Sequence, residues 1–268
     1  GQSLIAIGGG IVQDTTCFLA TTMMRGLPWI FYPTTLLAQS DSCIGSKSSI
    51  NSGELKNILG TFTPPSKVII DINFLESLED KDILSGIGEM IKVHAIDSPE
   101  SFDLLSESYE QLKNDSFLME HFIYQSLLMK KKLIEVDEFD TGPRNVMNYG
   151  HSFGHAIESA SNYTIPHGIA VTMGMDIANY VALKLGVSIN RHFERMHFVL
   201  DKNCKSYRKV SIDVNLLMQA LAKDKKNSST QLRLILPDMD GNITIGLYDN
   251  SKLLIDIIKD YFSKYGEK

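Results

Sequence analysis

The sequence of 268 residues predicts an α/β portion followed by a mainly α-helical portion, on the strength of two observations. Over residues 1–76, short apolar runs of strand length alternate with helical patterns, which is typical of a parallel sheet covered by helices. From residue 77 onward, apolar residues recur at the three- and four-residue spacing of long amphipathic helices. We therefore expect two domains, residues 1–76 and 77–268, with a cleft between them, which is a common place for a ligand.

Three strands are expected in the α/β portion, with a helix over residues 13–22 between the first two. The first strand, residues 3–7, runs directly into a triple-glycine turn, and the second, residues 29–32, ends before a proline. The third covers residues 67–71. Because a parallel strand needs hydrogen-bonding neighbours and the first strand lies at the start of the sequence, we expect an N-terminal segment with further strands to be missing.

The helical portion is expected to hold five long helices, over residues 79–97, 101–114, 117–135, 150–161 and 170–185, and a closing helix over residues 251–265. One hairpin is expected before the closing helix. Two strand-like runs, residues 232–236 and 243–247, flank the turn sequence Asp240-Gly241-Asn242 there.

Charge and composition exclude several classes of protein. The net charge of −6 and a pI near 5.6 argue against binding to the phosphate backbone of nucleic acid, which requires a basic face. No run approaches the roughly 18 apolar residues that span a membrane. Three widely spaced cysteines predict neither a disulfide framework nor a metal site, so we expect buried thiols in a reducing, cytoplasmic compartment: Cys17, Cys43 and Cys204.

Gly8, Gly9 and Gly10 stand between an expected strand and an expected helix. Glycines at this place let the backbone approach a pyrophosphate, whose charge the N-terminal end of the helix then stabilises. The spacing is not that of the usual dinucleotide motif, and by itself a structural turn explains it equally well. Asp14 also has a structural explanation, because a carboxylate near the start of a helix complements the helix dipole.

A hydroxyl-rich segment with lysines follows the second strand. Residues 33–42 carry threonines and serines, and Gly45-Ser46-Lys47 and Lys56-Asn57 come after them. Hydroxyl and ammonium groups suit the recognition of a phosphate or a carboxylate. Taken alone, a polar loop with solvated lysines is the simpler explanation.

Histidines give the clearest sign of chemistry. His151 and His155 are four residues apart, so a helix places both imidazoles on one face, which is the spacing of a zinc-binding pair. His167 follows, and Glu89 on an earlier helix offers a carboxylate that would complete a metal site. Two helical histidines are often only structural, but the glycines at 150 and 154 permit close approach and favour a metal site. We expect the other histidines to be solvated: His94, His121, His192 and His197.

Several separated motifs follow one another along the chain: residues 8–14, Met24-Arg25-Gly26, residues 33–42, Lys56-Asn57, residues 86–92, Asp137-Glu138, Arg144, residues 148–158 and His167-Gly168. Together they resemble the sugar-phosphate cyclases, and most closely the 3-dehydroquinate synthase family, from residue 4 to about residue 236. The resemblance implies an incomplete Rossmann-like, NAD-binding portion followed by a helical metal- and substrate-binding domain. It also implies a homodimer.

The resemblance also implies roles for individual residues. The NAD-binding residues would be Gly9, Gly10, Asp14, Thr34, Thr35 and Leu37. A divalent metal, Zn²⁺ or Co²⁺, would be held by Glu89, His151 and His167, whereas the spacing alone had nominated His155 as the second ligand. The catalytic residues would be His155, Lys47, Asn57, Arg25 and Lys92. The remaining substrate-binding residues would be Asp41, Lys130, Arg144, Asn148 and Lys225, with Lys130 and Arg144 on a carboxylate and Lys225 the best candidate for a C-terminal lysine.

The activity implied by the resemblance is that of a carbon–oxygen lyase of the shikimate pathway, which leads to the aromatic amino acids. It would convert 3-deoxy-arabino-heptulosonate 7-phosphate, a phosphorylated sugar acid, to 3-dehydroquinate with elimination of phosphate. Retention of Arg144, Lys130 and Asn148 favours this carboxylate-bearing substrate. Four positions depart from the family pattern: Gln13, Ser46, Gly88 and Ile169. Three alternatives stay open: another sugar-phosphate cyclase of secondary or polysaccharide metabolism, a metal-dependent polyol or glycerol-phosphate dehydrogenase, and a non-enzymatic zinc-bound helical module.

Overall fold

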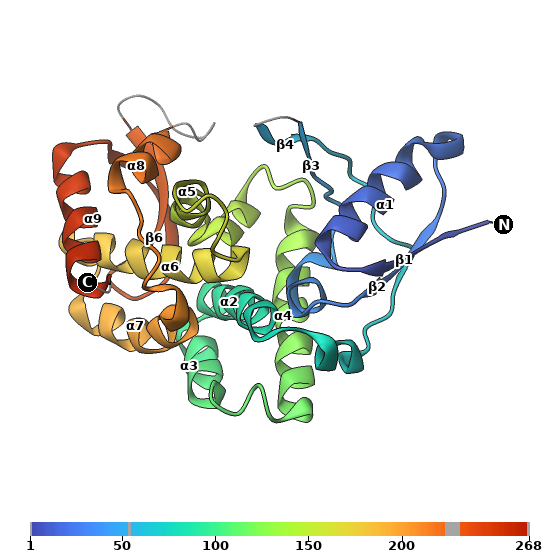
Figure 1. Ribbon diagram of the computed structural model, residues 1–268, viewed down its shortest axis with the longest axis horizontal. Coiled ribbons are helices and arrows are strands. Elements are labelled where there is room, and N and C mark those ends of the chain that lie inside the picture. Colours follow the sequence, from blue (N-terminus) through green and yellow to red (C-terminus); the bar gives the residue numbers. More distant parts are fainter. Residues whose placement is uncertain (1, 53–54, 223–230, 267–268) are drawn as a thin grey trace. The chain divides into compact units, whose positions relative to one another are not determined.

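The computed structural model describes residues 2–52, 55–222 and 231–266, and the chain divides into two compact units (Figure 1). Unit 1 consists of Gly1–Gly86 and Glu110–Asn145, and unit 2 of Ile87–Tyr109 and Val146–Lys268. The division passes through helix α2 (Asp80–Asp97), whose first residues belong to unit 1 and whose later residues belong to unit 2.

Unit 1 contains the predicted parallel sheet, with the strand order β1-β2-β5. Strands β1 (Leu4–Gly8) and β2 (Trp29–Pro33) pair in parallel over their full lengths. The third predicted strand is shorter than expected, because only β5 (Lys67–Val68) pairs with β2, although the next backbone N–H, that of Ile69, still donates to the carbonyl of Phe31 over 2.9 Å. The α/β fold class of this part is therefore confirmed.

The core of unit 1 lies on one face of this sheet. Ala6, Trp29 and Phe31 point to this face and pack with Cys17 and Ala20, which come from helix α1 (Gly10–Thr22). Two of the three cysteines, at positions 17 and 43, are buried in this cluster as free thiols, as predicted. The alternate residues of β1 are exposed, which is the period of two expected for a strand with one covered face.

Short elements complete unit 1. Strands β3 (Ile50–Ser52) and β4 (Leu55–Leu59) form an antiparallel pair that was not predicted. The remaining elements are the 3₁₀ helix η1 (Met23–Arg25), the π-helix η2 (Ala38–Ser42), the 3₁₀ helix η3 (Ile72–Ser77) and helix α4 (Ser116–Val136), and the 3₁₀ helix η4 (Pro143–Asn148) begins in this unit and ends in unit 2.

Unit 2 is built around helix α6 (His167–Lys184), which is buried continuously from its second residue to Ala182. Helices α5 (His151–Ala160), α7 (Asn190–Cys204) and α9 (Lys252–Tyr265) pack against it (Figure 1). The predicted hairpin is present as β6 (Gln231–Pro237) and β7 (Ile243–Asp249). The other elements are α3 (Pro99–Ser108), η5 (Lys205–Tyr207) and α8 (Val214–Ala222). Within the described ranges, no helix is both long and apolar enough to span a membrane.

Some sequence predictions for unit 2 were wrong. His94 was expected to be solvated, but it is only 2% exposed, and its Nδ1 lies 2.8 Å from the hydroxyl of Ser101. Its neighbour Lys92 is also buried, so the charged residues around His94 do not mark an exposed helix face. The predicted helix over residues 101–114 ends at Ser108, and helices α7 and α8 were not predicted.

A buried ionic network joins three helices of unit 2. The carboxylate of Asp176 on α6 is fully buried and accepts a hydrogen bond from the guanidinium of Arg208 over 2.9 Å. The hydroxyl of Tyr261 on α9 donates to the same oxygen over 2.5 Å, and His197 on α7 lies 2.8 Å from the other carboxylate oxygen. Because a buried charge without a partner is costly, this network makes the three helices depend on one another.

We expect Asp176→Asn to lower the free energy of unfolding by about 3–5 kcal/mol, because the buried guanidinium of Arg208 loses its buried charged partner and is left with Asp201, whose side chain is 41% exposed. Urea unfolding followed by circular dichroism at 222 nm measures the loss. The matched control is Lys113→Met, which breaks the exposed ion pair with Asp80 in unit 1 and should cost less than about 1 kcal/mol. Equal losses in the two variants would contradict a structural role for the network.

Candidate active site

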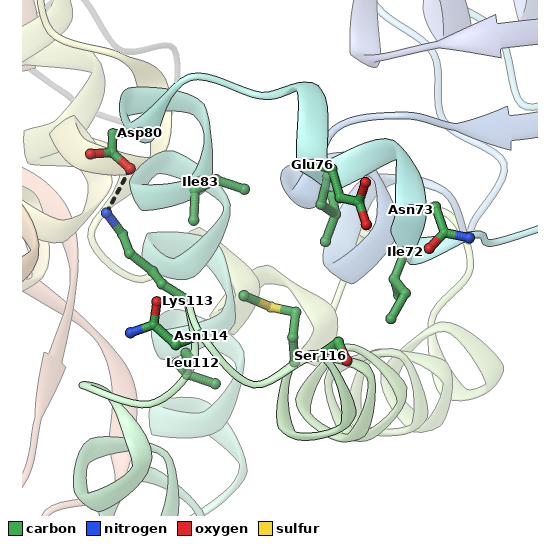
Figure 2. A pocket seen from close by; sticks show the side chains of 11 residues that line it. Ile72, Asn73, Glu76, Asp80, Ile83, Leu112, Lys113, Asn114 and Ser116 are labelled. Carbon is green, nitrogen blue, oxygen red and sulfur yellow. Dashed lines mark hydrogen bonds and ion pairs between the residues drawn. The ribbon is translucent and has the colours of Figure 1, made fainter.

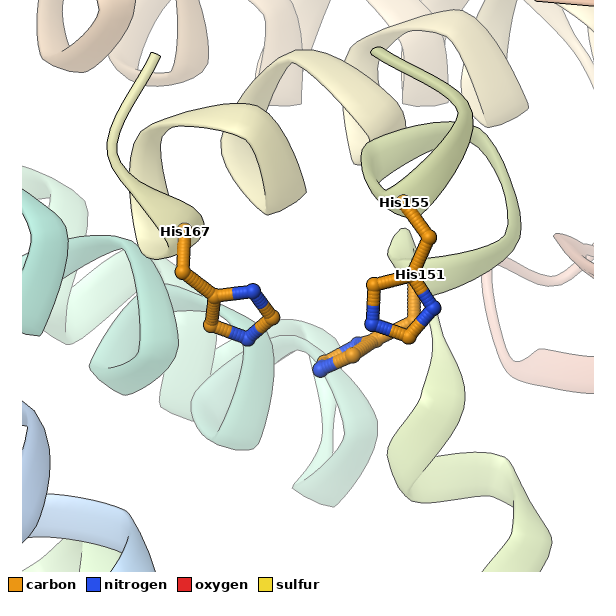
Figure 3. Close-up of side chains that lie close together, drawn as sticks. All are labelled: His151, His155 and His167. Atoms are coloured by element: carbon orange, nitrogen blue, oxygen red, sulfur yellow. The ribbon is translucent and has the colours of Figure 1, made fainter. Parts of the chain in front are cut away.

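Three histidines converge in unit 2. His151 and His155 lie on α5, and His167 is the first residue of α6, so two consecutive helices bring the rings together (Figure 3). The ring centroids are 5.3 Å apart for His151 and His155, 5.3 Å for His151 and His167, and 5.7 Å for His155 and His167. One nitrogen of each ring lies within 4.8 Å of the others. The rings therefore form a group that is compact enough to bind a metal.

Glycines allow the helices that carry these groups to approach closely. A Cβ atom on Gly88 of α2 would lie 2.2 Å from the carbonyl oxygen of Gly168 on α6, so only glycine fits. Gly150, which precedes α5, has a φ of +76°, and a Cβ there would lie 2.7 Å from the carbonyl oxygen of Val171. Contact of bare backbones thus sets the separation of α2, α5 and α6.

The carboxylate of Glu89 on α2 faces this histidine group, and the residue is only 1% exposed. Its Oε2 is 2.5 Å from Nζ of Lys92, while its Oε1 is buried and has no hydrogen-bond partner in the part of the chain that the structure describes. Nε2 of His167 lies 3.3 Å from Oε1, and Nε2 of His151 lies 3.6 Å from it. Two ligand atoms bound at about 2.0–2.2 Å to one tetrahedral zinc lie roughly 3.3–3.6 Å apart. The donor set therefore fits a divalent metal.

Protonation in this group also suits a metal. Burial lowers the pKa of His151 to about 3, so this imidazole is neutral and keeps a lone pair on a ring nitrogen. Burial also acts to lower the pKa of His167, but the hydrogen bond with Glu158 and the negative charge of Glu89 outweigh it and raise this pKa to about 10. Burial would raise the pKa of Glu89, yet the charge of Lys92 and the imidazoles hold it well below its usual range. An ionised carboxylate thus faces a neutral and a protonated imidazole, and a metal would displace the proton.

The Nδ1 atoms of His151 and His167 each lie within hydrogen-bond distance of an oxygen atom. Nδ1 of His167 lies 3.2 Å from Oε1 of Glu158, and Nδ1 of His151 lies 3.2 Å from the backbone carbonyl oxygen of Tyr149. In both rings this leaves Nε2 on the side of Glu89. Metal-binding histidines usually have such a partner on the other nitrogen. Glu158 was not predicted to have a role, although it lies on the same face of α5 as His151 and His155.

A second group of predicted residues comes together in unit 1. Lys47 forms an ion pair with Asp140 over 2.5 Å, and Lys130 on α4 forms one with Asp41 over 3.0 Å. Arg144 approaches the same segment, since a Cβ on Gly45 would lie 3.3 Å from its Nη2. The lysine of the first pair is 42% exposed and that of the second only 9%. Two cations, Lys130 and Arg144, therefore approach residues 41–47, which themselves carry Lys47.

Asp137 organises the loop that carries Arg144. Its carboxylate accepts hydrogen bonds from three backbone N–H groups, those of Thr141 (3.0 Å), Gly142 (2.8 Å) and Arg144 (3.1 Å). Burial acts to raise the pKa of Asp137, but these hydrogen bonds outweigh it and hold the pKa below its ordinary value. The guanidinium of Arg144 donates to the carbonyl of Glu138 in the same loop over 2.6 Å. Asp137-Glu138 was noted only as a motif, so this ordering role was not predicted.

The glycine turn of unit 1 leaves open space at the N-terminus of α1. A Cβ on Gly9 would lie 2.9 Å from Cγ2 of Thr35, and the N–H of Thr34 donates to the carbonyl of Gly8 over 2.9 Å. A Cβ on Gly10 would meet no described atom within 4 Å. Because no side chain caps α1 and its first turn holds no acidic residue, this open N-terminus fits an anionic group such as a pyrophosphate.

The other cofactor candidates of unit 1 lie around this turn. Asp14 accepts a hydrogen bond from the backbone N–H of Ser49 over 3.0 Å, and burial raises its pKa although bonds from Ser49 oppose the rise. Leu37 is half-buried directly before π-helix η2. Gln13, where the family pattern has glycine, is buried and braces the helix by donating to the carbonyl of Ser42 over 2.6 Å.

Four predicted residues remain, and the structure describes the side chains of only two of them, Arg25 and Asn148. Arg25 is exposed at a backbone φ of +67° and forms no hydrogen bond or ion pair with a described residue. Asn148 is half-buried at the end of η4. Asn57 lies on β4, but its side chain is outside the described part of the chain, and so is the whole of Lys225.

A cavity of 380 Å³ lies elsewhere in unit 1 (Figure 2). It is bordered by η3, the start of α2 and the start of α4, with the ion pair of Asp80 and Lys113 at its edge. None of the residues predicted for catalysis, substrate, cofactor or metal lines it. The cavity is therefore separate from both candidate groups.

Comparison with known proteins agrees with this arrangement. The family described as 3-dehydroquinate synthase N-terminal matches residues 1–85, and the family described as 3-dehydroquinate synthase C-terminal matches residues 86–227. A 3-dehydroquinate synthase from Dictyoglomus turgidum is 40% identical over 265 residues, which cover 97% of this chain and 73% of that relative.

Solved structures show the same fold. 2-epi-5-epi-valiolone synthase from Streptomyces hygroscopicus, with NAD⁺ and Zn²⁺ bound, matches with a TM-score of 0.85 at 23% identity, covering 98% of this chain and 75% of that one. 2-deoxy-scyllo-inosose synthase in complex with carbaglucose-6-phosphate, NAD⁺ and Co²⁺ matches with a TM-score of 0.82 at 24% identity, covering 98% and 74%. With both family matches and a 40% identical relative, the chain belongs to the 3-dehydroquinate synthase family.

Proposed function

We propose that this protein is a 3-dehydroquinate synthase, which converts 3-deoxy-arabino-heptulosonate 7-phosphate to 3-dehydroquinate and phosphate with NAD and a divalent metal. The observation that carries the proposal is the buried Oε1 of Glu89, which has no hydrogen-bond partner among the described residues and faces Nε2 of His151 and His167 at ligand spacing. In a member of this family, such a site supports metal-assisted chemistry on a polyol substrate.

The chain's own residues have separate tasks in this proposal. When bound, NAD accepts hydride and the divalent metal polarises a substrate oxygen. Glu89, His151 and His167 would hold the metal, and Lys92 neutralises and orients the second oxygen of Glu89. His155, beside the two ring ligands, is placed to exchange a proton with bound substrate. Gly9 and Gly10, with Asp14, Thr34, Thr35 and Leu37 around them, would hold the cofactor.

The cations of unit 1 would receive the charged groups of the substrate. Lys130 and Arg144 would hold the carboxylate, and Lys47 would meet the phosphate together with Arg25 and Asn57. The remaining predicted contacts are Asp41, Asn148 and Lys225. Lysine and arginine suit these anions because charge-assisted hydrogen bonds are stronger than neutral ones. The cation pair of Lys130 and Arg144 supports a sugar-acid substrate over sugar phosphates that lack a carboxylate.

The activity is tested by incubating the purified protein with 3-deoxy-arabino-heptulosonate 7-phosphate, NAD and zinc. We expect phosphate release without net NADH, because the overall conversion is neither an oxidation nor a reduction. Chelation of the metal should abolish release. Release from a heptulose 7-phosphate but not from the sugar acid would replace the substrate and keep the cyclase. Net NADH from a polyol or glycerol phosphate would instead identify a dehydrogenase, and zinc binding without any turnover would identify a non-enzymatic module.

Single histidine variants test the proposed ligand set. We expect His151→Ala to weaken zinc binding by more than the 10–100-fold that is typical for loss of an outer partner, because a direct ligand is removed. His155→Ala should keep the zinc and lose rate by the roughly 10²–10⁴-fold typical of an acid–base group. Zinc content by atomic absorption and phosphate release are measured on both variants. Equal zinc loss in the two would show that the ligand assignment is wrong.

Gly10→Ala tests the proposed cofactor turn. A methyl group has room in the protein, and alanine favours a helix over glycine by at most about 1 kcal/mol, so thermal stability should be unchanged or slightly higher. The methyl group would occupy the space in front of the helix N-terminus, so we expect NAD affinity to fall at least tenfold in titration calorimetry. The control is Thr15→Ala on the exposed face of the same helix. Unchanged NAD binding in the glycine variant would remove this turn from the cofactor site.

A further inference from the structure

We infer that Glu158 is a positioning residue of the metal centre, which fixes the ring of His167 through Nδ1 so that Nε2 faces the metal. This inference rests on the proposed metal centre. The observation behind it is the 3.2 Å distance between Oε1 of Glu158 and Nδ1 of His167, while Nε2 of the same ring lies 3.3 Å from Oε1 of Glu89. Each end of one imidazole thus meets a different carboxylate.

Two features of the fold hold Glu158 in place. The residue is only 7% exposed, and it lies on the same face of α5 as His151 and His155. Its backbone carbonyl accepts hydrogen bonds from the N–H of Tyr163 over 2.8 Å and from the hydroxyl of Ser161 over 3.2 Å. These contacts tie the turn after α5 to the end of the helix. That turn leads directly into His167, so Glu158 contacts both the backbone that delivers the ring and the ring itself.

The chemistry of imidazole explains why a carboxylate is useful here. An imidazole that binds a metal through Nε2 carries its proton on Nδ1, and that N–H needs an acceptor. A carboxylate accepts it with a charge-assisted hydrogen bond, fixes the ring orientation and makes the metal-binding nitrogen more basic. Glu158 is therefore suited to raise the metal affinity of His167 without touching the metal.

The two proposed imidazole ligands differ in a way that supports this role. The side chain of His151 is 15% exposed and needs only the neutral carbonyl of Tyr149 at its Nδ1. The side chain of His167 is 37% exposed at the very start of α6, so less packing restrains it. The charged partner belongs to the ring with the greater freedom, as expected if that partner sets the ring's orientation.

Two variants of Glu158 test the inference on the purified whole chain. We expect Glu158→Ala to weaken zinc binding by 10–100-fold, measured by competition with a chromophoric chelator. Glu158→Gln keeps an oxygen that can accept from Nδ1 but removes the charge, so its zinc affinity should lie between those of Glu158→Ala and the wild type. The absorption spectrum of the cobalt-loaded protein reports the ligand geometry and should change most in the alanine variant. Because glutamine is nearly isosteric, it remains informative if the alanine variant does not fold.

The control is Asp201→Asn, which removes a partner of Arg208 in the same unit and lies on α7, a helix that carries none of the three clustered histidines. It should bind zinc like the wild type, which separates a local effect from general loosening of unit 2. Zinc affinity of both Glu158 variants within twofold of the wild type would overturn the inference and leave the metal centre standing. Absence of zinc binding by the wild type would instead overturn the proposed metal centre and this inference with it.

Discussion

The buried carboxylate of Glu89 is the constraint on which the candidate site depends. An ionised carboxylate in a protein interior is costly unless each of its oxygens has a partner. Lys92 satisfies one oxygen, and only the imidazoles of His151 and His167 approach the other among the described residues. A divalent cation between these atoms would supply the missing partner and would explain why the three side chains converge.

The close approach of the helices makes this arrangement of side chains possible, and it depends on glycines, which have no side chain. At Gly88 and Gly150 the backbone of one helix or turn lies against the backbone of α6, where any Cβ would clash. The family pattern often has alanine where this chain has Gly88, and the contact with Gly168 shows that the glycine accommodates a very close approach of α2 to α6. The carboxylate and the rings are thus placed by rigid, buried backbone, which is the arrangement that keeps a site in its reactive geometry.

The sequence predicted the fold well where local rules decide it and less well where packing does. The short apolar runs correctly predicted strands β1 and β2, and the Asp240-Gly241-Asn242 turn correctly predicted the hairpin. The state of His94 could not be read from its charged neighbours, because Lys92 is itself buried against Glu89. The four-residue spacing predicted that His151 and His155 lie together. It could not show which ring nitrogens face Glu89 or that Glu158 lies next to Nδ1 of His167. Those facts depend on how helices α2, α5 and α6 pack against one another, and the ligand and pocket roles themselves stay predictions.

The cations of unit 1 differ in how readily they could change partners. The side chain of Lys47 is 42% exposed, so an incoming phosphate could reach its ammonium group and replace Asp140, which is 15% exposed, as its partner. Lys130 is 9% exposed and also donates to the backbone carbonyl of Asp41 over 2.6 Å, so exchange there would leave a buried acceptor unsatisfied. The carboxylate of the substrate stays on the molecule throughout the reaction, so a fixed cation suits it. The phosphate leaves, so its binding site must release it at every turnover. The exposure of the two lysines therefore matches the division of roles between Lys130 and Lys47.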